Sequence, residues 1–221
     1  MRATSIKQKA KAFSLLELLV VLATMVVLAA LMLPRLASSG KSPRIMCMFN
    51  LRQAGLGFIV FATDHGNQFP VQTSVTNGGS MEFVGTGSPA PHFQMISNYL
   101  GGHWDFLFCP SDKAKQQAAK GAAPSDRNIS YFLSMDATKG SPGIILAGDR
   151  NLEMAGQPIK PGLFSLANNA AVSWTSELHN QGKNAMGGNL LFADGRVETV
   201  RRNLPEVIQR QNLATNRLAF P

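Results

Sequence analysis

The chain has few of the residues that usually mark an enzyme or a metalloprotein. Of its 221 residues only two are cysteine and four are histidine, and no Cys-x-x-Cys pair occurs. Without closely spaced cysteine or histidine ligands, a structural zinc site is not expected. The sequence also lacks the Gly-x-Ser-x-Gly elbow of many hydrolases and the Asp-x-Asp-x-Asp-Gly loop of many calcium sites. We therefore predict no catalytic residue, no metal ligand and no cofactor.

Acidic residues are also scarce, which gives the chain the overall charge of a nucleic-acid-binding protein. There are 21 basic and 13 acidic side chains, so the formal net charge is +8. Four of the basic residues precede Ala12, however, which leaves 17 basic against 13 acidic side chains, or +4, in the rest. Because this modest excess is spread along the chain, no specific nucleic-acid partner is expected.

Only one long apolar run occurs, and it lies close to the N-terminus. From Phe13 to Leu33 the polar residues are Ser14, Glu17 and Thr24. As a helix this segment would be about 31 Å long, roughly the thickness of the hydrocarbon core of a membrane. The run is too long for a cleaved Sec signal peptide. The basic residues before it fit a signal anchor with a cytoplasmic N-terminus.

A plain anchor leaves Glu17 unexplained, because a carboxylate inside such a segment costs about 2.5 to 3.5 kcal/mol. The order of Lys11, Ala12, Phe13 and then Glu17 resembles the class III signal of type IV pilins and type II secretion pseudopilins. The resemblance implies that a prepilin peptidase cleaves between Ala12 and Phe13 and methylates the new amino group of Phe13. In that family the residue before the cut is usually Gly rather than Ala.

The same resemblance implies roles for two more residues. Glu17 would neutralise the Phe13 amine of a neighbouring subunit during assembly, and Pro34 stands where pilins carry a helix-kinking proline. A buried carboxylate and a buried ammonium are each costly alone and tolerable together. Their pairing is therefore suited to selective docking of one subunit on another.

The expected domain organisation follows from the implied cleavage site and from the extent of the apolar run. We predict a leader peptide over residues 1–12 and a transmembrane helix over 13–33. The remainder of the N-terminal helix covers 34–66, with a break near 38–43, and a periplasmic globular head covers 67–221.

Helix signals recur in the second of these helical segments. Ser42 can cap the helix, Pro43 suits its first turn, and Gly66 can close its C-terminus. Gly55 and Gly57 weaken a helix locally, and close packing against a sheet would explain them.

The rest of the chain predicts a small antiparallel sheet of about four strands. Its clearest hairpin covers 188–200, where Asp194-Gly195 supplies the turn. Further strands are predicted at 105–109, 129–135, 143–147 and 172–177, helices at 93–100 and 204–213, and a long surface loop at 67–91. The expected fold class is α+β and pilin-like, with the long N-terminal helix packed on the sheet.

Both cysteines, Cys47 and Cys109, follow the apolar run and would therefore lie in an oxidising compartment. The first expectation is a disulfide between them, which would join the long helix to the head. In the chain-entropy description it would stabilise the fold by roughly 4 kcal/mol. The alternative is a pair of buried thiols.

A second resemblance covers most of the head. Cys47-x-x-Asn50-Leu51-Arg52-Gln53, Cys109-Pro110-Ser111-Asp112, His179 and the stretch Asn189 to Asp194-Gly195 look like a pseudopilin-like family with a C-terminal His-to-Asp-Gly processing-associated motif. The interval between His179 and Asp194 is longer here than is usual in that family, because residues 181–188 form an enlarged Gly- and Asn-rich loop. The role of His179 is open.

These observations favour a structural subunit of a type II secretion pseudopilus or a related type IV pilus-like filament, and not an enzyme. The expected partners are prepilin peptidase, other pilin or pseudopilin subunits, the inner membrane, and the secretion or pilus assembly machinery. The expected location is the bacterial inner membrane, which the chain crosses once, with the head in the periplasm and then in the filament.

Three alternatives to a structural subunit that binds no metal remain open. The first is an adhesion or DNA-uptake module displayed on such a filament. The second is a membrane-anchored hydrolase that would recruit His179, Asp194, Asp149 and one nearby serine, such as Ser173 or Ser176, as its triad. The third is a calcium ion held by Asp149, Asn151 or Asp194, in the C-terminal region where major pseudopilins bind one.

Overall fold

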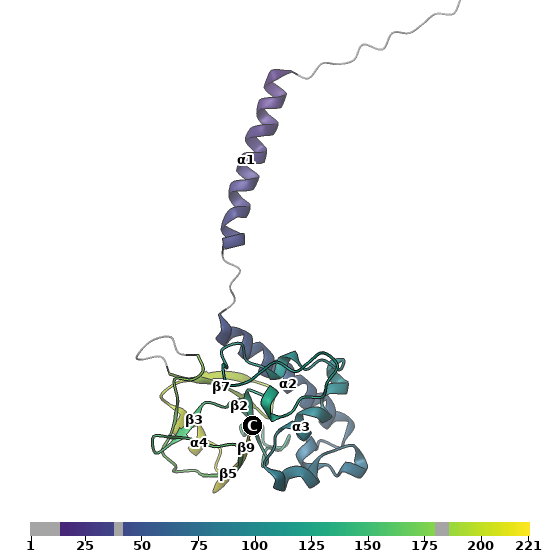
Figure 1. Ribbon diagram of the computed structural model, residues 1–221, viewed down its shortest axis with the longest axis vertical. Helices are drawn as coiled ribbons and strands as arrows, with labels where there is room; N and C mark the ends of the chain where they lie inside the picture. Colours follow the sequence, from purple (N-terminus) through teal and green to yellow (C-terminus); the bar gives the residue numbers. More distant parts are fainter. Residues whose placement is uncertain (1–13, 38–41, 180–185) are drawn as a thin grey trace, which may run out of the picture. The chain divides into compact units, whose positions relative to one another are not determined.

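The computed structural model describes residues 14–37, 42–179 and 186–221 (Figure 1). The chain divides into two compact units, residues 1–41 and residues 42–221. Helix α1 (Leu15–Ala37) occupies the first unit and continues past Pro34. The leader, Ala12 and Phe13 lie outside the described residues, as do residues 38–41, where a helix break was expected.

The second unit begins with helix α2 (Pro43–Asp64), which has Pro43 in its first turn. Among the described residues, α2 is the one helix long and apolar enough to cross a membrane, and 44% of its most apolar window is buried. The shorter apolar stretch Leu15–Leu31 comprises the residues of α1 whose side chains are described. One side of α2, including Leu51, Ala54 and Phe58, lies in the core of the head. The apolar composition of α2 is thus that of a core helix.

The centre of the head is a six-stranded antiparallel sheet of order β5-β9-β1-β2-β7-β8. Its strands are β1 (Tyr131–Ser134), β2 (Ile145–Asp149), β5 (Gly162–Ala167), β7 (Gly188–Phe192), β8 (Val197–Val200) and β9 (Thr215–Phe220). A second, three-stranded sheet has the order β4-β3-β6, with β3 (Leu152–Met154), β4 (Gln157–Pro158) and β6 (Val172–Trp174). The fold class is therefore α+β.

Both faces of the large sheet are covered, as Figure 1 shows. One face packs against α2 and the short helix α3 (Ala90–Met95), and the other against helix α4 (Leu204–Arg210) and the small sheet. This explains why every residue of β1, β2 and β7 is buried, including those that alternate to the far side. Both cores consist only of residues from 42–221, so this unit has what a domain needs to fold alone.

The glycines of α2 confirm close packing in part. A Cβ atom at Gly55 would lie 2.7 Å from Cδ1 of Leu191 on β7, so helix and sheet approach each other most closely there. At Gly57 the nearest atoms belong instead to Leu100 and Ile96, which lie in the loop region after α3. The expectation of packing against a sheet is therefore right for Gly55 and wrong for Gly57.

Several expected strands and helices are present. Strands β1 and β6 fall within the predicted segments, whereas β2 overlaps the predicted segment 143–147 and ends two residues later. The hairpin of β7 and β8 pairs Gly188 with Val200 as its sequence indicates. The predicted helices correspond to α3 with the 3-10 helix η4 (Ser97–Leu100), and to α4.

Other expectations were wrong. Residues 105–109 contain the 3-10 helix η5 (Asp105–Leu107) rather than a strand, because Phe106 and Leu107 are buried among residues of α2 and the loops. The sheet has six strands rather than about four. The expected surface loop 67–91 is folded into the 3-10 helices η1 (Pro70–Gln72), η2 (Val75–Asn77) and η3 (Met81–Thr86), and Phe69 is fully buried.

Candidate functional site

The first candidate site is the N-terminal end of α1. Ser14 Oγ accepts a hydrogen bond from the Glu17 N–H at 3.2 Å, and Glu17 Oε2 accepts one from the Ser14 N–H at 3.0 Å. This reciprocal pair is a capping box. This role of Glu17 was not predicted, although Ser-x-x-Glu before an apolar run is its sequence signal. The Glu17 carboxylate is exposed and sits at the positive end of the helix dipole.

Every described side chain of α1 from residue 14 to 31 is exposed. Leu15 is 79% exposed and Leu31 is 68% exposed, and the leucines and valines between them cover all sides of the helix. A helix that is apolar all round is stable only where something apolar surrounds it. Exposed to water, this apolar surface would be costly.

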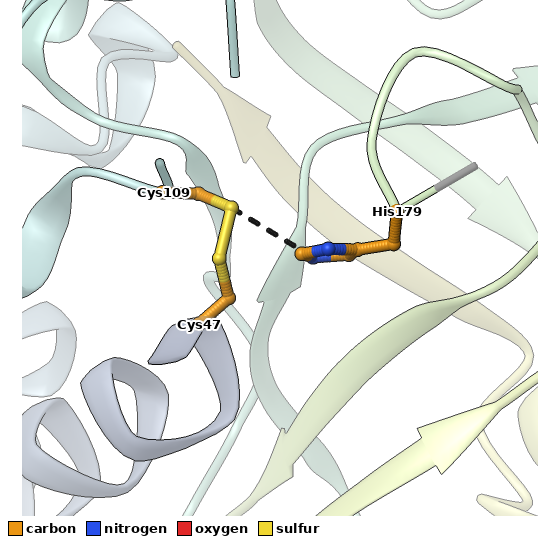
Figure 2. A group of neighbouring side chains, drawn as sticks. All are labelled: Cys47, Cys109 and His179. Carbon is orange, nitrogen blue, oxygen red and sulfur yellow. Dashed lines mark hydrogen bonds between the residues drawn. A yellow bond between two sulfur atoms is a disulfide. The ribbon is translucent and has the colours of Figure 1, made fainter. Parts of the chain in front are cut away.

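The second candidate site lies inside the head, at a disulfide between Cys47 of α2 and Cys109 (Figure 2). The S–S distance is 2.04 Å and the Cα atoms are 5.3 Å apart. Figure 2 shows His179 with its imidazole directed at this disulfide, and its Nε2 lies 3.7 Å from Cys109 Sγ. All three residues are buried. They come from α2, from the loop after η5 and from the segment after β6, so the cluster connects these three parts of the chain.

The ligand-type atoms of Cys47, Cys109 and His179 lie within 4.8 Å of one another, close enough for a shared metal ion. Metals bind the thiolate form of cysteine, however, and both sulfur atoms are committed to the disulfide. In this oxidised form the cluster offers a metal only His179.

Asp149, at the end of β2, is the centre of the buried polar network. Its Oδ2 accepts hydrogen bonds from the backbone N–H of Asn189 at 2.7 Å and from Asn189 Nδ2 at 3.1 Å. His179 Nε2 lies 3.2 Å from the same oxygen. Two residues of the sequence motif, His179 and Asn189, therefore meet at one fully buried carboxylate. From the sequence, Asp149 was considered only for catalysis or calcium binding. A single acidic residue at the end of an apolar strand was the sequence signal for this buried network.

His179 has a backbone φ of 56°, which is uncommon for a residue with a side chain. Its contacts with Cys109 and Asp149 hold it in this conformation. Among residues 14–37, 42–179 and 186–221, its Nδ1 has no hydrogen-bond partner, and Ser173 Oγ bonds to Glu153 rather than to a histidine. The structure thus brings together the histidine and one aspartate of the hydrolase alternative, without a serine bonded to the ring.

A cluster of charged residues near this network links the segment that contains Asp112 to the segment that contains Glu177. Arg150 donates to both carboxylate oxygens of Asp112 at 2.7 Å and to Glu177 at 3.1 Å. The Asp112 side chain is fully buried, and its charge is balanced by the bonds from Arg150 together with one from the Ala114 N–H at 3.1 Å. The hydrogen bonds that Arg150 donates to Asp112 raise the pKa of Arg150 above its usual value.

Asp194 and Gly195 form the turn between β7 and β8. Asp194 Oδ1 accepts a hydrogen bond from the Arg196 N–H at 2.9 Å, and Gly195 has a φ of 85°. The turn faces α2, because a Cβ atom at Gly195 would lie 2.6 Å from Ile59 Cδ1. The register of β2 and β7 places Asp194 at the opposite end of the strand pair from Asp149. The oxygens considered for calcium are therefore not gathered at one point.

Comparison with protein-family models, with curated proteins and with solved structures finds no match to the chain.

Proposed function

We propose that this chain is a structural subunit of a type II secretion pseudopilus or a related type IV pilus-like filament. It would be cleaved between Ala12 and Phe13 by a prepilin peptidase, methylated on Phe13, and held by α1 in the bacterial inner membrane before assembly. The head would face the periplasm. The proposal takes the fold to be pilin-like, with α2 as the part of the N-terminal helix that packs on the sheet.

One observation carries the proposal: Glu17 is the single charged residue among the described residues of α1 up to position 31, in a helix whose apolar side chains are all exposed. It stands four residues after Phe13, at the end of the helix where a new amino group would appear after cleavage. In an apolar environment that carboxylate needs a positive partner, and the Phe13 amine of a neighbouring subunit supplies one.

The disulfide is consistent with this role. It fastens α2 to the loop after η5, so that a force applied through the N-terminal helix reaches the core of the head through a covalent bond. The buried network of Asp149, His179 and Asn189 supports the same region.

The capping box permits a sharp test of Glu17. Glu17→Gln keeps an oxygen that can accept the Ser14 N–H bond but removes the charge. We expect this variant to be inserted and processed normally, while its incorporation into filaments falls at least about a hundredfold, because breaking a buried ion pair costs roughly 3 kcal/mol or more. Filaments sheared from cells that carry the full assembly machinery are quantified by immunoblot.

Ser14→Ala is the matched control, since it removes one bond of the capping box and leaves the charge. It should assemble nearly as well as the wild type. Normal assembly of Glu17→Gln, or an equal defect in both variants, would show that Glu17 acts only as a helix cap and would contradict the proposal.

A further inference from the structure

The filament function does not require a histidine and a carboxylate to be buried beside the disulfide of the head. Cys47 and Cys109 are fully buried, and so is the side chain of His179, whose ring is directed at the disulfide (Figure 2). Imidazole nitrogen and thiolate sulfur are the ligand atoms that zinc prefers in proteins. The disulfide withholds the two thiolates, because a metal binds the deprotonated cysteine. Reduction of the disulfide would supply them.

The distances around His179 match those of a tetrahedral zinc ion. Bonds of about 2.1 Å to nitrogen and about 2.3 Å to sulfur place these two ligand atoms about 3.6 Å apart. His179 Nε2 lies 3.7 Å from Cys109 Sγ, and Cys47 Sγ lies within 4.8 Å of both atoms. Two sulfur atoms on one zinc ion are about 3.8 Å apart. Rotation of the two cysteine side chains is enough to reach this separation, because their Cα atoms are 5.3 Å apart.

Asp149 is placed to supply a fourth ligand. Its Oδ2 lies 3.2 Å from His179 Nε2, and a nitrogen and an oxygen on one tetrahedral zinc ion are about 3.4 Å apart. Within residues 14–37, 42–179 and 186–221, the buried Asp149 Oδ1 has no hydrogen-bond partner, so the carboxylate has acceptor capacity left for a metal. Two hydrogen bonds from Asn189 hold the carboxylate in place, as outer-shell partners do in metal sites.

The buried charges also balance when a zinc ion is present. Two thiolates and the Asp149 carboxylate carry three negative charges, and the ion supplies two positive charges. Arg44, which is only 8% exposed, supplies the third. Burial and Arg201 lower the pKa of Arg44 and the Asp149 carboxylate raises it, so these two buried groups act on each other. The charges of this region therefore sum to zero, which limits the cost of burying them.

We propose that the reduced head binds one Zn²⁺ ion at this cluster. Its ligands are the thiolates of Cys47 and Cys109 and the Nε2 atom of His179, and the Asp149 carboxylate takes the fourth position. The disulfide and the zinc ion are thus alternative states of one site. The ligands lie 62 and 70 residues apart along the chain, which is why their spacing in the sequence gave no sign of a metal site.

The exchange between the two states balances with a dithiol as reductant. The dithiol transfers two electrons to the bond between Cys47 and Cys109 and becomes a disulfide itself, and its two protons pass to the protein sulfur atoms. Zinc then replaces these protons: two S–H bonds break, two Zn–S bonds form, and two protons are released to water. His179 ligates as the neutral imidazole, with its own proton on Nδ1.

The test uses the head fragment 42–221, which contains both cores and is reduced with a phosphine that adds no thiol ligand. Co²⁺ is titrated first, because tetrahedral Co²⁺ bound to thiolates absorbs visible light strongly and hydrated Co²⁺ does not. Zn²⁺ is then added in competition, which gives its affinity. We expect one ion per chain in the reduced fragment. The oxidised fragment lacks both thiolates and should bind Zn²⁺ at least about a hundredfold more weakly.

His179→Gln tests the histidine ligand. In the reduced fragment it should weaken Zn²⁺ binding at least about tenfold, since the loss of an outer-shell partner alone costs about 10- to 100-fold. His103→Gln is the matched control, because His103 is an exposed histidine that lines a separate cavity. It should bind Zn²⁺ as the wild type does. The proposal is overturned if the reduced wild type binds no ion, or if the two histidine variants respond alike.

The melting temperature of the reduced fragment is a second measurement, which decides if His179→Gln does not fold. Zn²⁺ should raise the melting temperature of the reduced wild type and leave that of the variant with alanine at Cys47 and Cys109 unchanged. An equal shift in both would overturn the proposal. So would a fall in the reduced wild type, because it would mean that Zn²⁺ binds the cysteines of the unfolded chain. Neither result bears on the filament proposal, which the Glu17 variant tests.

Discussion

Replacing Cys47 and Cys109 with alanine should destabilise the head by about 4 kcal/mol. The disulfide joins residues 62 positions apart and closes that loop in the unfolded chain. The chain-entropy relation gives a loss of about 14 cal/mol/K for a loop of this length, or about 4 kcal/mol at 25 °C. The substitution leaves only small cavities, because Cys→Ala removes a single sulfur atom at each position.

Urea unfolding of the fragment 42–221, followed by tryptophan fluorescence, measures this loss. Trp174 is buried in the core on the α4 side of the sheet, and Trp104 packs against the core on the α2 side. The two tryptophans therefore report on both cores. With a slope of roughly 2 kcal/mol per M of urea, the unfolding midpoint should fall by roughly 2 M.

The single variants sharpen the test. Cys47→Ala and Cys109→Ala each break the same bond, so each should lose nearly as much as the double variant, and the losses should not add. A reductant should lower the midpoint of the wild type to a similar value and leave the double variant unchanged. An unchanged midpoint in the double variant, or free thiols in the untreated wild type, would refute the reasoning.

Three further predictions concern His92, Arg150 and Gly188 of the head. Burial lowers the pKa of His92 from 6.5 to about 4, so the unfolded chain binds a proton at this histidine before the folded chain does. The free energy of unfolding should therefore fall by about 3 kcal/mol as the pH drops from about 6.5 to 4. Equal dependence of that free energy on pH in wild type and His92→Gln would contradict this. Arg150→Lys should cost about 1–3 kcal/mol in urea unfolding, because one ammonium cannot replace the paired bonds to buried Asp112; a loss below about 0.5 kcal/mol would contradict it. Gly188→Ala should cost about 1–3 kcal/mol by calorimetry, since its Cβ would lie 2.3 Å from the buried Trp174 ring, and an unchanged melting temperature would show that the ring moves freely.

Local signals predicted local structure well. Pro43 marks the first turn of α2, and Asp194-Gly195 marks the turn of the hairpin, because such features depend on a few neighbouring residues. Ser42 stands at the N-cap position as expected, but its side chain makes no capping hydrogen bond. The two cysteines were chosen as a pair because the sequence contains no others.

Structure that depends on distant residues was not predicted. Strand β9 comes last in the chain but pairs with both β5 and β1, and the sequence pattern of neither partner indicates this register. The run 105–109 is apolar enough for a strand, but its backbone folds as η5 beneath α2. Periodicity cannot separate these outcomes for so short an apolar segment.

For the candidate sites too, residues close together in the sequence could be predicted and residues far apart could not. The N-terminal motif is contiguous, so its residues could be named from the sequence. The network around Asp149 joins three segments that only the folded sheet brings together. His92 is fully buried, with its Nδ1 2.6 Å from Ser80 Oγ. A histidine beside proline gives no sign of such a distant partner.

The central claim is that the chain is processed and assembled as a pilin-like subunit, and the mass of its mature N-terminus tests this most directly. The intact protein is isolated from cells that contain prepilin peptidase and is analysed by mass spectrometry. We predict a chain that begins at Phe13 and carries one methyl group on its amine. A chain that retains Met1, or one cut beyond Ala30, would contradict the claim.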